Sequence, residues 1–210
     1  MIRILIADDH AVVRRGLAQI LAEAPEITSV GEAQNANEIM SLIRSQTFDL
    51  VILDLALPDK NGLEVLKDVK REHPKLPVLV LSMHPEDQYA LRVLKAGAAG
   101  YLTKESAPEE LITVIKKVLK GGRYISSQLA EQLVLDLGAG ATKPIHDSLS
   151  DREYQIMCLI ASGKTISEVA DLLAISVKTA STYRTRILEK MQMKTNAELT
   201  HYAIQQKLVT

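Results

Sequence analysis

Five short apolar runs alternate with amphipathic stretches through the first 121 residues, and this alternation constrains the fold more than any other feature. Runs such as 50–53 (LVIL) and 78–81 (VLVL) are apolar at consecutive positions, which is typical of parallel strands buried on both faces. We expect strands at 2–7, 28–34, 49–54, 77–82 and 99–103, separated by helices at 11–24, 36–45, 62–73, 86–96 and 108–120. This order predicts an α/β fold with a doubly wound, five-stranded parallel sheet of the flavodoxin-like type.

The remainder of the chain has a different pattern. Residues 124–137 predict one more helix, and the following GAGATKPIHD has the Gly, Ala and Pro composition of a linker. From 148 to 210 we expect four helices and no strand. Three of them begin with the Ser/Thr-x-x-Glu signature of a capping box, at Ser150, Thr165 and Thr195, and the fourth, at 177–191, follows Ser176. The predicted domains are therefore 1–121 (α/β), 122–147 (linker helix and flexible linker) and 148–210 (all-α).

A fourth capping-box signature lies in the α/β part. Ser106 and Glu109 have the same spacing, and Pro108 falls in the first helical turn, where its missing N–H costs nothing. The sequence therefore predicts a capped start for the helix at 108–120.

Polar side chains stand at the ends of four predicted strands. Asp8 and Asp9 follow the first strand, Asp54 ends the third, and Ser82 and Lys104 stand at the ends of the fourth and fifth. Because ligands of open α/β sheets bind beyond the carboxyl ends of the strands, we expect these groups to converge. Three carboxylates repel one another unless a cation lies among them, and oxygen ligands beside a phosphate favour Mg²⁺. With a lysine and a hydroxyl to hold phosphate oxygens, the set suits phosphoryl transfer to Asp54.

Composition excludes several other classes of protein. No apolar run approaches the roughly 18 residues of a membrane helix, and the N-terminus lacks a basic-then-apolar leader, so we expect a cytoplasmic protein. The single cysteine, Cys158, is expected to be a buried thiol. His10 and His84 lie near the acids in sequence, but we expect them to orient loops or face solvent rather than to bind metal. With no Trp and 3% aromatic residues, a stacking platform for single-stranded nucleic acid is not expected.

The motifs ADDH, VILDLALPDKNG, VLSMH and AGYLTKESAPEEL resemble the receiver domain of bacterial two-component response regulators, over essentially all of residues 1–121. The resemblance implies that a partner histidine kinase phosphorylates Asp54. It also implies that Asp8, Asp9 and Asp54 bind Mg²⁺ together with the backbone carbonyl of Ala56. Lys104 would contact the phosphoryl group.

The resemblance further implies a switch pair, in which the Ser82 hydroxyl turns to the phosphoryl group and the Tyr101 ring follows inward. Two positions depart from the family pattern. Glu105 stands where many receivers have a cis proline, and a cis bond to Glu would cost about 3 kcal/mol, so we expect a trans peptide or local strain. Ala56 offers no side chain to position an attacking water, so the lifetime of the phosphoryl group is not predicted.

The predicted helix at 177–191 is basic on one side. A step of 100° per residue gathers Val177, Ala180, Ile187, Leu188 and Met191 on an apolar stripe. Between 177 and 194 the chain has five basic residues and a single acid, Glu189; the basic residues are Lys178, Arg184, Arg186, Lys190 and Lys194. A mixed polar helix face is usually only a solvated surface, but a capped helix and the short connection LAIS precede this one.

Residues 150–207 resemble the LuxR-type helix-turn-helix module, and the whole chain is similar to the NarL/FixJ class and its GacA/UvrY-like branch. The resemblance implies base contacts in double-stranded DNA from Ser181, Thr182 and Thr185, although short hydroxyl side chains read bases weakly. The residues expected at the DNA phosphates are Lys178, Thr179, Tyr183, Arg184, Arg186 and Lys190. Arg184 also lies close to the apolar stripe, where it could instead extend along the core.

These features together predict a transcription regulator controlled by phosphorylation, which forms a homodimer on two DNA half-sites. We expect it to catalyse only its own phosphoryl acceptance and autodephosphorylation. One alternative is a phosphate-independent DNA-binding regulator whose receiver is a dimerisation or interaction module. A remote alternative is an aspartyl-phosphate hydrolase of the haloacid-dehalogenase type, which would need an acid where Ala56 stands.

Overall fold

The computed structural model describes residues 2–83, 86–127, 129–131, 144–206 and 208–209. The chain divides into two compact units, Met1–Ala130 and Glu131–Thr210. The first unit is α/β and the second is helical, as predicted. Within the described residues, no helix is both long and apolar enough to cross a lipid bilayer.

The first unit contains a five-stranded parallel sheet with the strand order β2-β1-β3-β4-β5. Its strands are β1 (Ile2–Ala7), β2 (Ile27–Ala33), β3 (Leu50–Asp54), β4 (Val78–Ser82) and β5 (Gly100–Thr103). Every residue of β3 and β4 is buried, which is the burial that their continuous apolar runs predict. The order places β1 and β3 side by side at the centre, so that their carboxyl ends are neighbours.

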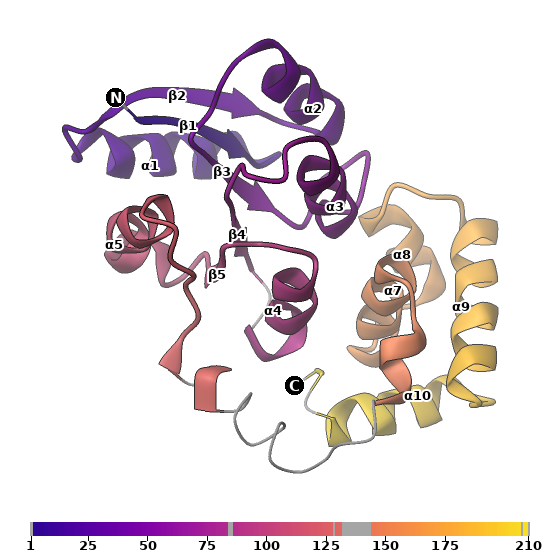
Figure 1. Ribbon diagram of the computed structural model, residues 1–210. Helices are drawn as coiled ribbons and strands as arrows, with labels where there is room; N and C mark the ends of the chain where they lie inside the picture. The colour runs from indigo at the N-terminus through magenta and orange to yellow at the C-terminus, as the bar shows by residue number, and fades with distance from the viewer. Residues whose placement is uncertain (1, 84–85, 128, 132–143, 207, 210) are drawn as a thin grey trace. The chain divides into compact units, whose positions relative to one another are not determined.

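Helices cover both faces of this sheet. In Figure 1, α1 (Ala11–Ala22) and α5 (Ala107–Leu119) lie on one face, whereas α2 (Ala36–Ser45), α3 (Gly62–Glu72) and α4 (Glu86–Lys95) lie on the other. The first pair contributes to a buried core with alternate residues of the strands, among them Ile4, Ile6, Leu50, Ile52, Leu79 and Leu81. The doubly wound fold predicted from the alternation of apolar runs is thus confirmed.

The capping residues of three helices differ from the sequence prediction or were not part of it. Ser106 does not cap α5, because its backbone is already helical (φ −82°, ψ −15°) and its hydroxyl instead donates to the carbonyl of Thr103 at 3.2 Å. The predicted cap at this position was wrong. Asn35 and Asn61, which the sequence analysis did not single out, cap α2 and α3 by accepting from the N–H groups of Glu38 and Leu63.

The segment after α5 returns to the sheet edge. The Tyr124 N–H donates to the Ala99 carbonyl at 2.9 Å, and Tyr124 forms a parallel β-bridge with Gly100. A Cβ atom at Gly100 would lie 2.9 Å from the Tyr124 carbonyl oxygen, so only glycine permits this approach. The helix predicted to begin at 124 therefore does not begin there. Residues 127 and 129–131 are helical, and residues 132–143, which include the last six residues of that predicted helix and most of the predicted linker, lie outside the described residues.

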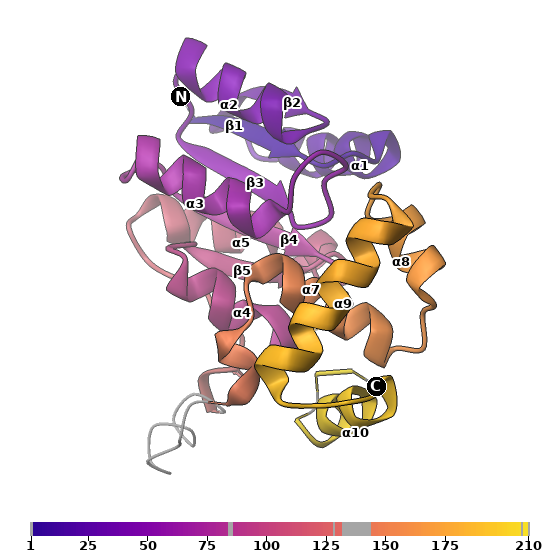
Figure 2. The same cartoon turned by 90° about the vertical axis from the view of Figure 1, so that its right-hand side faces the viewer.

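The second unit begins with a short 3₁₀ turn, η1 (Ile145–Ser148), and continues as α7 (Asp151–Ala161), α8 (Ile166–Leu172), α9 (Val177–Met191) and α10 (Asn196–Gln205). In Figure 2, α9 runs beside α7 and α8, and α7 also packs against α10. The capping boxes at Ser150 and Thr165 are complete. Thr195 caps α10, but the Glu198 carboxylate accepts from the Lys194 N–H instead of that of Thr195. Cys158 is buried, as expected.

Candidate functional site

The carboxyl ends of β1 and β3 bring acidic side chains together. Asp8 and Asp54 are 1% and 2% exposed, and Asp9 follows Asp8 at the start of the loop to α1. One ligand atom from each of these acids and from His10 can be chosen so that all four lie within 4.8 Å of one another. The predicted convergence of the acids is therefore observed, and His10 joins them.

Lys104 joins the same cluster from the end of β5. Its Nζ atom lies 2.6 Å from Asp8 Oδ2 and 2.7 Å from Asp54 Oδ2, so one cation pairs with two buried carboxylates. Its backbone N–H donates to the Ser82 carbonyl at 2.8 Å, which extends the pairing of β4 and β5 by one residue. The ends of four strands thus meet at one place, because adjacent parallel strands end at the same edge.

Burial and charge oppose each other at this cluster. Burial raises the pKa of Asp54 above its ordinary value, because its effect exceeds that of the hydrogen bond and charge of Lys104. Burial alone would lower the pKa of Lys104, but its interactions with Asp54 and Asp8 outweigh burial and raise it. A single lysine therefore neutralises only part of the negative charge at this edge.

The donor set fits a divalent cation. Asp9 Oδ1 is buried and accepts no hydrogen bond within the described residues, although His10 Nδ1 lies 2.7 Å away. Asp8 Oδ2 accepts none apart from its ion pair with Lys104. Buried carboxylate oxygens are costly without a donor or a cation, so these atoms could serve as ligands. Carboxylate oxygens suit Mg²⁺ and similar hard ions.

The remaining residues predicted for this site lie on β4 and β5 or directly after β3. The Ala56 N–H donates to Asp54 Oδ1 at 3.2 Å, whereas the role of its carbonyl as a metal ligand stays a prediction. Ser82 is buried at the end of β4, and Tyr101 is 1% exposed on β5; the movement of these two side chains on phosphorylation stays a prediction. The Lys104–Glu105 bond is trans, as are all peptide bonds in the described parts of the chain.

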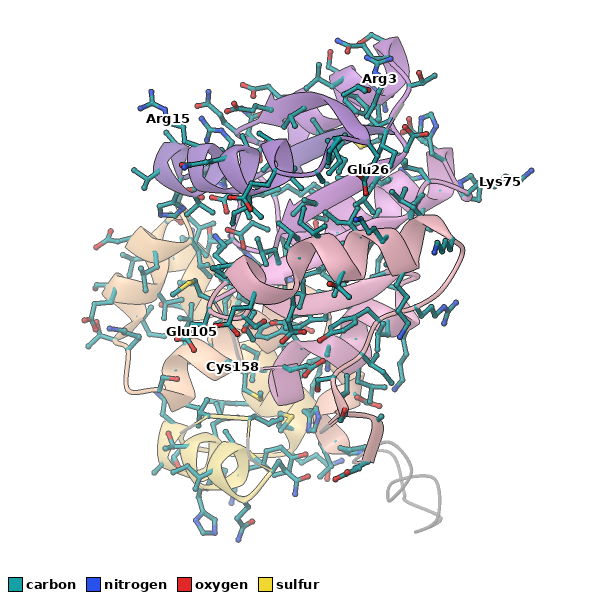
Figure 3. All side chains as sticks on the ribbon, turned by 90° about the vertical axis from the view of Figure 1, so that its left-hand side faces the viewer. Arg3, Arg15, Glu26, Lys75, Glu105 and Cys158 are labelled. Atoms are coloured by element: carbon teal, nitrogen blue, oxygen red, sulfur yellow. The ribbon has the colours of Figure 1, made fainter. Side chains whose placement is uncertain are left out.

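Sequence reasoning missed two residues that shape the site. The Arg14 guanidinium is buried, donating to the Asp8 carbonyl at 2.8 Å and to Glu32 Oε2 at 2.9 Å. Arg15, its neighbour, extends outward from α1 in Figure 3. The sequence signal for Arg14 was its spacing of three residues from the apolar Leu17, which places it on the buried side of α1. Gly62 is the second residue, because a Cβ atom there would lie 2.4 Å from the Asp54 carbonyl oxygen.

In the second unit, α9 has the two-sided character that its periodicity predicts. Ala180, Ile187, Leu188 and Met191 are buried, but Val177 is 49% exposed, so the apolar stripe begins one turn later than predicted. The predicted contact residues Lys178, Thr179, Ser181, Thr182, Thr185 and Arg186 are exposed, whereas Tyr183 and Arg184 are half-buried. The Thr182 and Thr185 hydroxyls donate to carbonyls one turn earlier in α9, which leaves their oxygens able to accept.

Two of the predicted phosphate contacts have partners inside the unit. Arg184 Nε donates to Asn196 Oδ1 of α10 at 2.6 Å, and Lys190 Nζ lies 2.6 Å from Oε2 of the buried Glu153 of α7. Burial acts to raise the pKa of Glu153, but Lys190 and the Ser150 cap outweigh it and lower this pKa. Both basic side chains therefore link α9 to neighbouring helices.

Comparison with known families matches both units. Residues 4–116 match the response regulator receiver domain family, and residues 147–203 match the bacterial regulatory proteins of the luxR family. Response regulator UvrY of Escherichia coli (strain K12) is 37% identical over 209 residues, covering 99% of this chain and 96% of UvrY. Response regulator GacA of Pseudomonas aeruginosa is 37% identical over 210 residues, covering 100% of this chain and 98% of GacA.

A solved structure of a response regulator also matches this chain across both units. RcsB from Salmonella enterica serovar Typhimurium, bound to promoter rprA in the presence of the phosphomimetic BeF₃⁻, is 26% identical with a TM-score of 0.65. The match covers 96% of this chain and 97% of RcsB.

Proposed function

Since the chain belongs to the two-component response regulators, with a receiver domain followed by a luxR-family domain, we propose that it is a DNA-binding transcription regulator controlled by phosphorylation of Asp54. The observation that carries this proposal is the cluster in which Asp54 and Asp8 share Lys104 at 2.6–2.7 Å. A cation-bridged pair of buried acids with unsatisfied neighbouring oxygens can accept both a metal and a phosphoryl group.

In the proposed reaction, the Asp54 carboxylate attacks the phosphorus atom of a phosphohistidine on a cognate sensor kinase. The bond from phosphorus to the kinase nitrogen breaks as the bond to the Asp54 oxygen forms. Asp8, Asp9, Asp54 and the Ala56 carbonyl would hold Mg²⁺, which when bound neutralises charge on the transferring group. Lys104 would exchange its ion pair with Asp54 for one with the phosphoryl oxygens.

The proposed switch follows from that exchange. The new phosphoryl oxygens draw the Ser82 hydroxyl and Lys104 away from their present partners, and the end of β4 and β5 adjusts. Tyr101, which is 1% exposed on β5, would be the second member of the switch pair, and its ring would move with the end of β4 and β5. Autodephosphorylation would need a water molecule to attack the phosphoryl group, and the methyl side chain of Ala56 cannot orient that water.

In the DNA-binding step, α9 would enter the major groove of double-stranded DNA in the cytoplasm. Ser181, Thr182 and Thr185 would face the bases, and Lys178, Thr179, Tyr183 and Arg186 would contact the phosphates. Arg184 and Lys190 are weaker candidates, since any DNA contact would compete with Asn196 and Glu153. The promoter-bound RcsB structure with a phosphomimetic supports this step. A structure of two RcsB dimers bound to two parallel DNAs supports the pairing of two copies on DNA.

Selection of DNA from a random pool tests the proposal directly. Full-length protein is incubated with Mg²⁺ and a small phosphodonor, or with Mg²⁺ alone, before each round. We expect enrichment of sites with two related half-sites only after phosphodonor treatment. Failure to enrich any sequence under either condition would contradict a specific DNA-binding function.

The second candidate is a phosphate-independent DNA-binding regulator, whose receiver would serve as a dimerisation or interaction module. It predicts the same enriched sites, with equal enrichment, in both arms of the selection. Equal enrichment would therefore replace the phosphorylation-controlled proposal with this one.

A further inference from the structure

His10 lies directly after the two acids of β1 and precedes the first residue of α1. Its Nδ1 atom is 2.7 Å from Asp9 Oδ1 and 3.4 Å from Asp8 Oδ1. Yet Asp9 Oδ1 accepts no hydrogen bond within the described residues, so the short approach lacks hydrogen-bond geometry. A ring nitrogen and a carboxylate oxygen that lie this close without a shared hydrogen resemble two ligands of one ion.

We infer that His10 Nδ1 is a direct ligand of the divalent cation held by Asp8, Asp9 and Asp54, and that it gives the site a preference for Mn²⁺ over Mg²⁺. This inference rests on the metal site of the proposed function. It replaces the expectation from sequence that His10 only orients its loop or faces solvent.

The distances are compatible with one ion. The four donor atoms lie within 4.8 Å of one another, whereas an ion with bonds of about 2.2 Å holds opposite ligands about 4.4 Å apart. A closure of a few tenths of an ångström would therefore complete the site. One of the four donors, Asp8, is buried, and its Oδ2 atom has no hydrogen bond apart from its ion pair with Lys104.

Two hydrogen bonds hold the backbone of His10, whereas most of its side chain is exposed. The His10 N–H donates to Asp8 Oδ1 at 2.8 Å, and the His10 carbonyl accepts from the Arg14 N–H at 3.1 Å. The side chain is 65% exposed, so the ring can turn toward an ion without disturbing the core. The fixed backbone holds the ring beside the acids, so that ion binding would have to order only the two side-chain torsions of His10.

Ligand chemistry gives the expected selectivity. Carboxylates suit Mg²⁺ and Mn²⁺ alike, but Mg²⁺ demands oxygen ligands and retains its waters, whereas imidazole is a ligand of first-row transition ions. One nitrogen among carboxylate oxygens should therefore add affinity for Mn²⁺ and little for Mg²⁺.

Pulsed electron paramagnetic resonance of Mn²⁺ bound to the full-length protein tests the inference. We expect the electron spin echo of the wild type to be modulated by a directly bound ¹⁴N nucleus. His10→Ala should abolish that modulation. His73→Ala and His84→Ala are the matched controls, and both variants should retain the ¹⁴N modulation. His84 is included because it follows the end of β4 by two residues in the sequence. Modulation that survives His10→Ala, or that is lost in His84→Ala, would overturn the inference.

Metal affinity provides the second readout. Titration should show that His10→Ala weakens Mn²⁺ binding by about tenfold while Mg²⁺ binding changes less than about twofold. Equal weakening for both ions would overturn the selectivity. If Mn²⁺ binds and Asp8→Asn weakens it, but no ¹⁴N modulation is seen, the role of His10 fails and the proposed acidic site stands. If the wild type binds neither ion, both proposals fail.

Discussion

The acidic cluster at the sheet edge and the polar face of α9 were both predicted from sequence, but the structure treats their charges differently. At the sheet edge, Asp8 and Asp54 are buried and rely on Lys104. On α9 most predicted contact residues are exposed, and two basic ones join neighbouring helices through Asn196 and Glu153. Strand ends bring like charges together in a buried place, which lowers the stability of the fold. On a helix face, some charged residues can pair with neighbouring helices while others stay exposed for binding.

The largest effect is expected for Lys104→Met. Without this cation, Asp8 and Asp54 remain buried with no positive partner, and the metal-free first unit should lose about 3 kcal/mol of unfolding free energy. Saturating Mg²⁺ should restore most of the loss, because the ion replaces the missing charge. Urea denaturation followed by circular dichroism, with and without Mg²⁺, measures both values. Lys67→Met, an exposed lysine on α3, is the control. An equal loss in both conditions would show that the acids do not bind Mg²⁺.

In the second unit, Glu153→Ala should cost about 2 kcal/mol, because it removes half of a capping box and the buried partner of Lys190. Glu168→Ala removes the matching residue of an exposed capping box and should cost less. Since the pKa of Glu153 is lowered in the folded protein, its charge stabilises the fold above its ordinary pKa of 4.5, and this contribution disappears as the pH falls through the lowered value. Denaturation at several pH values measures the difference. Equal costs for the two variants would indicate that the Lys190 pair contributes nothing.

Asp54→Asn should raise the unfolding free energy of the first unit, whereas Lys104→Met should lower it. Burial raises the pKa of Asp54, so ionising it costs stability once the pH exceeds its ordinary value of 3.8. The metal-free variant should therefore be more stable than the wild type by about 1 kcal/mol at neutral pH, with a difference that shrinks as the medium becomes acidic. Thermal unfolding of both proteins from acid to neutral pH provides the comparison. A variant less stable than the wild type would mean that the Lys104 pair outweighs burial.

The smallest effects are expected on α9. Lys178→Ala or Arg186→Ala should weaken DNA binding several-fold and reduce the slope of log affinity against log salt by about 1. Arg184→Ala and Lys190→Ala should leave that slope nearly unchanged and lower the stability of the second unit instead. Fluorescence anisotropy over a series of salt concentrations gives the slopes. Four equal slopes would remove the distinction between the two kinds of basic residue.

These contrasts also explain how much the sequence could predict. The alternation of strands and helices is a local and repetitive pattern, and parallel strands end at one edge of their sheet. The positions of Asp8, Asp54 and Lys104 at one edge therefore followed from counting strand ends. Periodicity likewise identified the two sides of α9. The ion pair of Lys190 with Glu153 joins residues that lie 37 positions apart, and no local pattern indicates it.

Errors at element ends have the same origin. Ser106 has the spacing of a capping residue, yet its backbone conformation directs the hydroxyl to Thr103. The sequence predicts a helix that begins at Tyr124, but Tyr124 pairs with Gly100 because that glycine permits a close backbone approach. Tertiary contacts decide both cases, and local sequence signals do not describe them.

The central claim is that a phosphoryl group on Asp54 controls the affinity of α9 for DNA. It is tested most directly by titrating one selected DNA site with wild type and Asp54→Asn, each with Mg²⁺ and with or without a small phosphodonor. The account predicts that the phosphodonor tightens binding of the wild type and has no effect on the variant. An equal gain in DNA affinity by Asp54→Asn would contradict it.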